Sequence, residues 1–139
     1  YGPRASLANN KINILHYYMK EMIGTKDFLE IWSDGNQKRS FIFVKDVVDA
    51  MLVLVEKNKS FSTINVASGQ ILSVNELLKK LLKISGSKIK IKYNKSKKNM
   101  TPDRILDNSK LVQDFDWRPK FSIDDGLKLT YNWMKSQLL

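Results

Sequence analysis

The stretch SDGNQKRSFIFVKDVVDA, residues 33–50, decides how the rest of the chain is interpreted. Its Asp34-Gly35 pair is typical of a tight turn, and the apolar run over 39–44 is typical of a strand buried on both faces. Asp46 can cap the helix that the following residues predict. Arg39 is unusual in this setting, because it lies between a turn and a buried strand, where an unpaired charge is costly.

Helical and strand-like patterns alternate on either side of this stretch. Apolar residues at helical spacing predict the helices, and a Ser73–Glu76 capping box starts one of them. Alternating or continuous apolar runs predict the strands. The order is that of an α/β protein in a single domain, 1–139, without an internal repeat. Helices are expected over 11–24, from Asp46 to about Glu56, from Ser73, over 109–115 and from Ser122. Strands are expected over 29–32, 39–44, 63–67 and 89–93, and a loop over 94–104.

The composition indicates an ordinary globular domain. The chain has 139 residues, of which 42% are hydrophobic and 27% charged. No apolar run approaches the ~18 residues that span a bilayer, no signal peptide is recognisable, and the absence of cysteine excludes disulfides and thiolate metal sites. A cytoplasmic protein without a membrane partner is expected. Because the chain opens on the loop-like YGPR without a methionine, we expect it to be a fragment of a longer chain.

The net charge of +10 raises the question of a polyanionic partner. Residues 79–98 contain nine lysines and no acidic residue. Lysines without interleaved arginines and stacking aromatic residues are a weak signal for nucleic acid. We interpret the stretch as a solvated lysine-rich face, and a nucleic-acid-binding domain is kept as the less favoured alternative.

No complete set of catalytic residues is recognisable in the chain. It contains no G-x-S-x-G elbow, no glycine-rich dinucleotide loop, no P-loop and no histidine–carboxylate group with metal spacing. The one histidine, His16, lies beside Tyr17 and Tyr18 on a predicted helix, and we expect a surface or packing role for it. The sequence therefore predicts neither a catalytic residue nor a metal site.

Arg39 and Arg104 are the strongest candidates for binding a ligand. The guanidinium group presents a planar fork that matches phosphate oxygens and stays charged when partly desolvated. Each arginine lies where a loop meets a regular element, which is the usual place for binding residues on a rigid scaffold. The alternative is an ion pair, to Asp34 or Asp46 for Arg39 and to Asp103 or Asp107 for Arg104.

Five segments, taken together, resemble the C-terminal half of an extended short-chain dehydrogenase/reductase, in the NAD(P)-dependent nucleotide-sugar epimerase/dehydratase family. Each segment is a modest signal alone, and the five in the family's order cover nearly the whole chain. They are YGPR (1–4), IWSDGNQKRSFIFVKDVVDA (31–50), INVASGQILSVNEL (64–77), TPDRILDNSKL (101–111) and FDWRPKFSIDDGLKLTYNW (115–133).

The resemblance implies roles for the candidate residues. Arg39 stands where the family's arginine binds the diphosphate of the nucleotide sugar, and Arg104 matches a second basic phosphate contact. Trp32, which could otherwise be a core residue, matches a position against the nucleotide, and Lys20 is a weaker candidate for a further phosphate contact. The segment Tyr1, Gly2 and Pro3 matches the part of the family that follows the catalytic helix and lies at the NAD or NADP cofactor.

The resemblance also implies what the whole enzyme would do. The family transfers hydride between NAD(P) and the sugar, using a Tyr-x-x-x-Lys pair and a dinucleotide-binding domain that would precede Tyr1. This chain would be the small α/β substrate domain, inactive alone, and a homodimer is expected for the full-length protein. A non-catalytic nucleotide-binding module remains an alternative, since only the catalytic pair would separate the two.

Within the family, the segment SKKNMTPDRILD (96–107) is most similar to the GDP-L-fucose synthase branch, which reads S-K-P-D-G-T-P-R-K-L-L-D. Asn99-Met100 replaces Asp-Gly, and Ser40 replaces the acidic residue after the arginine. The branch's catalytic histidine, expected around 11–13, is absent. These differences favour a related epimerase, reductase or dehydratase that acts on a nucleotide sugar.

Overall fold

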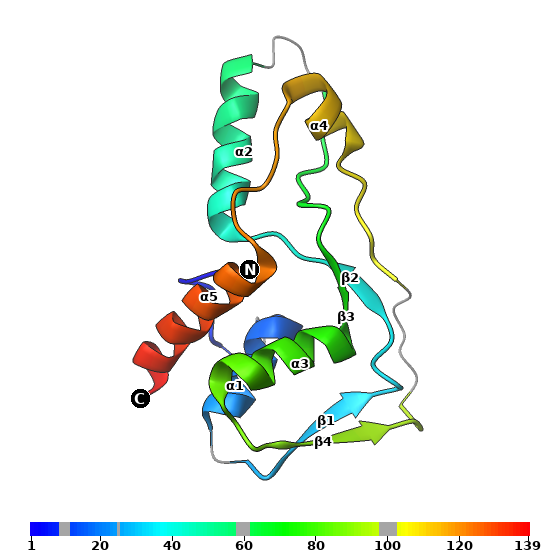
Figure 1. Ribbon diagram of the computed structural model, residues 1–139, viewed down its shortest axis with the longest axis vertical. Helices are drawn as coiled ribbons and strands as arrows, with labels where there is room; N and C mark the ends of the chain where they lie inside the picture. The colour runs from blue at the N-terminus through cyan, green and yellow to red at the C-terminus, as the bar shows by residue number, and fades with distance from the viewer. Residues whose placement is uncertain (9–11, 25, 58–61, 98–102) are drawn as a thin grey trace.

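The computed structural model describes residues 1–8, 12–24, 26–57, 62–97 and 103–139. In these residues the chain forms five helices and four strands, which Figure 1 shows as an elongated molecule. The elements, in chain order, are α1 (Ile14–Ile23), β1 (Phe28–Trp32), β2 (Lys38–Ser40), α2 (Val44–Lys57), β3 (Ile71–Ser73), α3 (Val74–Ser85), β4 (Lys90–Asn94), α4 (Ser109–Phe115) and α5 (Ile123–Leu138).

The strands form two small sheets. β1 and β4 are parallel, with Phe28 opposite Lys90 and Trp32 opposite Asn94. β2 and β3 are antiparallel, and Arg39 lies opposite Leu72. Since a parallel pair needs a long crossover connection, the segment from β2 to α3 has to run between β1 and β4 in the sequence.

The main core lies where α1, α3 and α5 pack together over β1 and β4, in the lower half of Figure 1. Its helices contribute apolar side chains at helical spacing, as an amphipathic face does. A second, smaller cluster joins α2 and α4 around Ala50, Leu111 and Trp117 in the upper half. The largest fully buried side chains of the main core are Leu15, Met19, Leu29, Ile31, Val74, Leu77, Leu81, Leu127 and Met134.

Most predicted helices are confirmed, and two of their N-caps are the ones that the sequence indicates. Ser73 and Glu76 form a reciprocal capping box, in which the Ser73 amide donates to Glu76 Oε2 at 2.7 Å. α4 has the predicted bounds, and Ser122 caps α5. α1 begins later than expected, because the Asn13 side chain accepts from the His16 amide at 3.1 Å and caps the helix there.

One predicted strand is shorter than expected, and another is wrong. The strand expected over 39–44 is only Lys38–Ser40, and residues 62–68 contain no strand. Other contacts satisfy part of the backbone there: the Ser68 hydroxyl donates to Phe41 O, Asn108 Nδ2 donates to Ala67 O at 3.0 Å, and Tyr1 forms two backbone hydrogen bonds with Ile42 and Val44. The apolar pattern of both segments reflected burial, which periodicity alone cannot assign to a strand.

The cap predicted at Asp46 is also wrong. α2 begins at Val44, which places Asp46 inside the first turn. The side chain is 1% exposed, and its carboxylate accepts from the Lys120 amide at 2.9 Å and the Phe121 amide at 3.4 Å. Asp46 therefore joins α2 to the segment before α5, and it does not cap its own helix.

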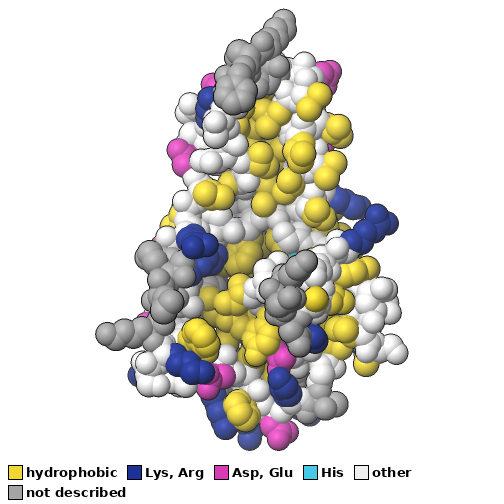
Figure 2. Space-filling model, turned by 180° about the vertical axis from the view of Figure 1, so that it is seen from behind, with side chains coloured by type: hydrophobic (Ala, Val, Ile, Leu, Met, Phe, Trp, Pro, Cys, Tyr) yellow, Lys and Arg dark blue, Asp and Glu magenta, His cyan; other side chains and the backbone are white. Residues whose placement is uncertain are grey.

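α2 carries an apolar face that the rest of the described chain leaves uncovered. Val48, Met51, Leu52 and Val55 are 51%, 56%, 64% and 83% exposed. Figure 2 shows hydrophobic side chains gathered in this upper part of the molecule. An exposed apolar patch of this kind marks a surface that associates with another surface. No helix within the described ranges is long and apolar enough to cross a bilayer.

We expect the 139-residue chain on its own to self-associate through α2. The double variant Val48→Glu/Leu52→Lys should shift it toward monomer, because it places charges on the patch while forming a helix-compatible i,i+4 pair. Sedimentation equilibrium of the wild type and the variant measures this. Leu129→Lys, at an exposed apolar site on α5 that is 43% exposed, is the control. An unchanged mass distribution for the double variant would show that α2 is not the contact.

Candidate functional site

The structure brings Arg39 and Arg104 side by side. A parallel bridge joins them, in which the Arg104 amide donates to Lys38 O and the Ser40 amide donates to Arg104 O, both at 3.0 Å. Residues paired in this way project from the same face of a sheet. Two guanidinium groups, separated by 65 positions in the sequence, therefore leave one face together.

The segment that carries Arg104 is held on β2 by further hydrogen bonds. The Lys38 amide donates to Asp103 Oδ1 at 2.7 Å, and the Leu106 amide donates to Ser40 Oγ at 3.0 Å. Ser40, which replaces an acidic residue of the similar branch, thus uses its hydroxyl to fix the neighbouring segment. Hydrogen bonds therefore hold the backbone on both sides of the bridge between the two arginines.

Each carboxylate that could pair with the arginines accepts a hydrogen bond from another donor. Asp34 accepts from the Asn36 amide at 3.0 Å, and this hydrogen bond lowers the Asp34 pKa. Asp107 accepts from the Ser109 amide at 2.9 Å and from its hydroxyl, and the two bonds lower the Asp107 pKa. Asp103 and Asp46 accept from backbone amides. Arg39 Nη1 donates to Lys38 O at 2.7 Å. Two cationic side chains on one face of the sheet favour an anionic ligand.

A hollow of about 260 Å³ adjoins Arg39. It lies between the first turn of α1 and the segment that follows β2, and Tyr1, Asn13, Ile14 and Phe41 are among its lining residues. Larger hollows exist, such as one of about 630 Å³ lined by Lys26, Phe28 and Lys88. The candidate site is the one at the arginines, because two adjacent arginines can bind an anionic ligand, whereas the volume of a hollow alone does not indicate a ligand.

Trp32 is a surface residue, so its interpretation as a core residue is wrong. The side chain is 55% exposed at the end of β1, and Lys97 Nζ lies 4.9 Å from the indole centroid. Lys97 also pairs with Glu30 at 2.8 Å, and hydrogen bonds from Lys97 and Asn94 lower the Glu30 pKa. An exposed indole held at a strand end is a suitable surface for a flat ring.

Lys20 is not among the residues that the structure places with the arginines. It lies in the last turn of α1, half-buried, whereas the arginine hollow adjoins the first turn of that helix. Lys20 lies six positions after Ile14, which corresponds to about 9 Å along the helix. A phosphate contact from Lys20 stays a prediction that the fold leaves untested.

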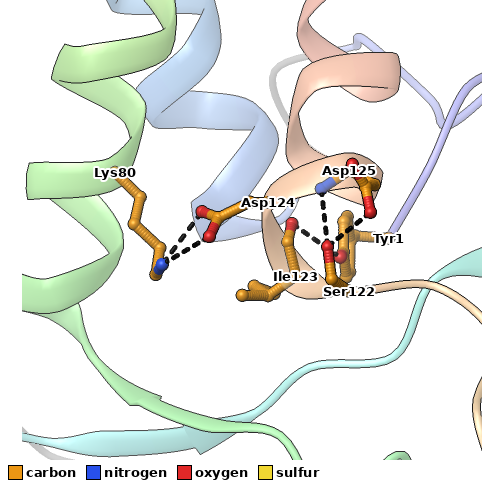
Figure 3. Close-up of polar contacts among 6 residues, drawn as sticks. All are labelled: Tyr1, Lys80, Ser122, Ile123, Asp124 and Asp125. Atoms are coloured by element: carbon orange, nitrogen blue, oxygen red, sulfur yellow. Dashed lines mark hydrogen bonds and ion pairs between the residues drawn. The ribbon is translucent and has the colours of Figure 1, made fainter.

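The segment Tyr1, Gly2 and Pro3 is built into the fold. The Tyr1 amino group donates to Ile42 O and the Val44 amide donates to Tyr1 O, both at 2.8 Å. The Tyr1 hydroxyl donates to Ile123 O at 3.4 Å, beside the Ser122 cap of α5, as Figure 3 shows. In the same view Lys80 pairs with Asp124 at 2.9 Å and links α3 to α5. A Cβ on Gly2 would lie 2.4 Å from a Val44 methyl, which explains the glycine.

His16 is a packing residue, as one of the sequence interpretations predicted. It is fully buried, with ring nitrogens 2.8 Å from Asn13 Oδ1 and 3.1 Å from Gly2 O. Burial lowers the His16 pKa, and the hydrogen bond to Gly2 opposes that shift. Among the described residues, no group of three or more histidine and carboxylate side chains could hold a metal ion.

Solved structures show the same arrangement of elements. The UDP-glucose 4-epimerase of Thermotoga maritima, solved with UDP-glucose, matches the whole chain with a TM-score of 0.87 and 30% identity, over 44% of its own length. The UDP-glucuronic acid 4-epimerase of Bacillus cereus, solved with NAD, matches with a TM-score of 0.81 and 28% identity, over 43% of its length. The chain therefore has the α/β fold of enzymes of the extended short-chain dehydrogenase/reductase class.

Sequence comparisons narrow the class. The family model described as GDP-mannose 4,6 dehydratase matches residues 1–130. The GDP-L-fucose synthase of Sinorhizobium fredii is 30% identical over 94% of this chain and 43% of its own length. The chain belongs to the NAD(P)-dependent nucleotide-sugar epimerase/dehydratase family, and it spans less than half the length of the curated relatives it matches.

Proposed function

We propose that this chain forms the substrate side of an NAD(P)-dependent nucleotide-sugar enzyme, with Arg39 and Arg104 binding the diphosphate. The observation that carries the proposal is the bridge that places both arginines on one face. A diphosphate bears about two negative charges, and each charge-assisted hydrogen bond contributes roughly 1.5–3 kcal/mol. Two adjacent guanidinium groups can supply much of the affinity for such a ligand.

The exposed indole of Trp32 supports a role in contacting the base. It lies at the end of β1, and a short turn of residues 33–37 connects it to β2 and Arg39. Stacking of a base on an aromatic side chain contributes about 1–3 kcal/mol. In this arrangement the base lies against Trp32, the diphosphate lies between the arginines, and the sugar extends toward the hollow lined by Tyr1 and Asn13.

The family model and the GDP-L-fucose synthase relatives favour guanine as the base, whereas the solved epimerase of Thermotoga maritima holds UDP-glucose. The matching family model is described by a GDP-sugar substrate, and a relative in Sinorhizobium fredii and another in Arabidopsis thaliana are described by a GDP-sugar product. We therefore propose a GDP-sugar as the substrate. The differences at Ser40 and at Asn99-Met100 still favour a reaction related to that of fucose synthase over that reaction itself; the pair 99–100 lies outside the described residues.

The cofactor would be NAD or NADP, which accepts or donates the hydride when bound. At Tyr1 and Gly2 few backbone groups are left to bind the cofactor. The amino group and carbonyl of Tyr1 are hydrogen-bonded to Ile42 and Val44, and the Gly2 carbonyl is hydrogen-bonded to His16. Pro3 is half-buried, so part of its ring is exposed and can pack against a ring of the cofactor. We propose that Tyr1–Pro3 borders the cofactor and that residues outside this chain hold it. The contribution of this chain to catalysis is then to fix the sugar in place.

Calorimetric titration of the complete protein with GDP, UDP, dTDP and CDP tests the proposal. GDP should bind most tightly, and Arg39→Ala and Arg104→Ala should each weaken GDP binding by about 10- to 100-fold, the equivalent of one or two charge-assisted hydrogen bonds. Arg118→Ala is the matched control, since Arg118 is an exposed arginine that lines a different hollow. Equal GDP affinity in a folded Arg39→Ala variant, or an equal loss in Arg118→Ala, would contradict the assignment.

A further inference from the structure

The turn between β1 and β2 connects two residues of the proposed site, Trp32 and Arg39. Its backbone is unusual, because Ser33 and Gly35 have φ values of 63° and 73°. Left-handed backbone is disfavoured for residues with a side chain, so the turn needs contacts that hold it. Two hydrogen bonds from Asn36 to the Asp34 carboxylate lie within the turn, and further contacts come from outside it.

Asn75, in the first turn of α3, supplies three of the contacts from outside the turn. Its side-chain Nδ2 donates to Asp34 O and to Asn36 Oδ1, both at 3.0 Å. Its backbone amide donates to Gly35 O at 3.0 Å. Asn75 thus contacts three consecutive residues of the turn, 34–36. It lies 41 positions after Asp34 in the sequence.

The orientation of the Asn75 amide is set from the other side. Tyr93 Oη donates to Asn75 Oδ1 at 2.8 Å, so the oxygen faces a donor and the nitrogen faces two acceptors. Tyr93 belongs to β4 and lies opposite Ile31, next to the pair of Trp32 with Asn94. The contacts of Asn75 therefore reach the turn that leads to Arg39 and β4, the strand that pairs with the one ending at Trp32.

The turn also packs directly against this amide. A Cβ on Gly35 would lie 2.3 Å from Asn75 Oδ1, closer than real Cβ contacts come. Gly35 is buried. The glycine thus serves two requirements, the left-handed φ and the close approach of Asn75.

We infer that Asn75 is a positioning residue of the nucleotide site, which fixes the spacing between Trp32 and Arg39. The inference rests on the proposed function. A ligand that contacts both residues benefits from their fixed spacing, because the second contact forms without a further ordering cost. A ligand that contacts only the arginines does not. Asn75 itself touches neither the base nor the diphosphate in this arrangement.

The test compares GDP with inorganic pyrophosphate, in the complete protein, by calorimetry. Asn75→Ala should weaken GDP binding about tenfold, the equivalent of 1.4 kcal/mol, and leave the pyrophosphate affinity within about twofold. Asn132→Ala, an exposed asparagine on α5, is the matched control and should change neither affinity. Far-UV circular dichroism and urea unfolding establish that each variant is folded.

Tyr93→Phe provides a second variant if Asn75→Ala does not fold. It removes one hydrogen bond to Asn75 Oδ1 and leaves the contacts to the turn, so a smaller loss confined to GDP is expected. Equal losses for GDP and pyrophosphate, or no loss in either variant, would overturn the positioning role while the arginine assignment stands. A wild-type protein that binds neither ligand would overturn the proposed function itself.

Discussion

Replacing Phe43 with alanine is expected to lower the free energy of unfolding by about 4 kcal/mol. Phe43 is 2% exposed, and its ring centroid lies 4.8 Å from that of Phe121 and 5.6 Å from that of Tyr1. It also lies against Gly126, where an added Cβ would meet the Phe43 ring at 3.1 Å. The substitution removes the side chain that joins the N-terminal segment to the start of α5, and leaves a cavity.

Urea unfolding followed by circular dichroism measures the effect. Phe28→Ala is the control, since Phe28 is 45% exposed on β1 and Lys92 Nζ lies 3.9 Å from its ring centroid. That variant should lose less than about 1 kcal/mol. Similar losses in the two variants would mean that Phe43 is not part of a closely packed interior.

The Asp46→Ala variant is expected to lose about 3 kcal/mol of stability. Its carboxylate is buried, and the Lys120 and Phe121 amides would lose their acceptor. A buried donor without an acceptor costs roughly 1–3 kcal/mol. Since the bonds join α2 to the segment before α5, their loss should affect the whole fold and not one helix end.

The Asp46→Asn variant distinguishes the hydrogen bonds from the volume of the side chain. It keeps one acceptor oxygen in the same shape, so it should lose about half as much as the alanine variant. Chemical unfolding of both variants at one pH gives the comparison. If both variants lose equally small amounts of free energy of unfolding, the two amide contacts do not hold these segments together.

The sequence predicts local features of this fold well. The Ser73–Glu76 capping box, the bounds of α4 and the Ser122 cap depend on residues within one helical turn, and all are confirmed. The strand expected over 63–67 depends on a neighbour along its length, and the described residues provide none. Asp46 illustrates the same limit, because its partners Lys120 and Phe121 lie more than 70 positions away.

The candidate site shows what a resemblance adds and what it leaves out. Arg39 and Arg104 could be selected from their chemistry and from the resemblance, but their adjacency needed the bridge between β2 and the segment at 104. No feature of the sequence indicates a role for Asn75 in the site. It lies inside a capping box whose function is local, and no pattern in the sequence indicates that its amide reaches the turn at 34–36.

The bridge between Arg39 and Arg104 has a consequence for how the protein responds to its ligand. The amide protons of Ser40 and Arg104 are both used in that bridge, so they exchange with solvent only when the two segments separate. A ligand held by both arginines binds the closed form alone, and at 100 times its Kd it stabilises that form by about 2.7 kcal/mol. Exchange at these two amides would then slow by about a hundredfold on ligand saturation. Amide exchange would thus report substrate binding at two identified residues, even in a chain that carries out no chemistry.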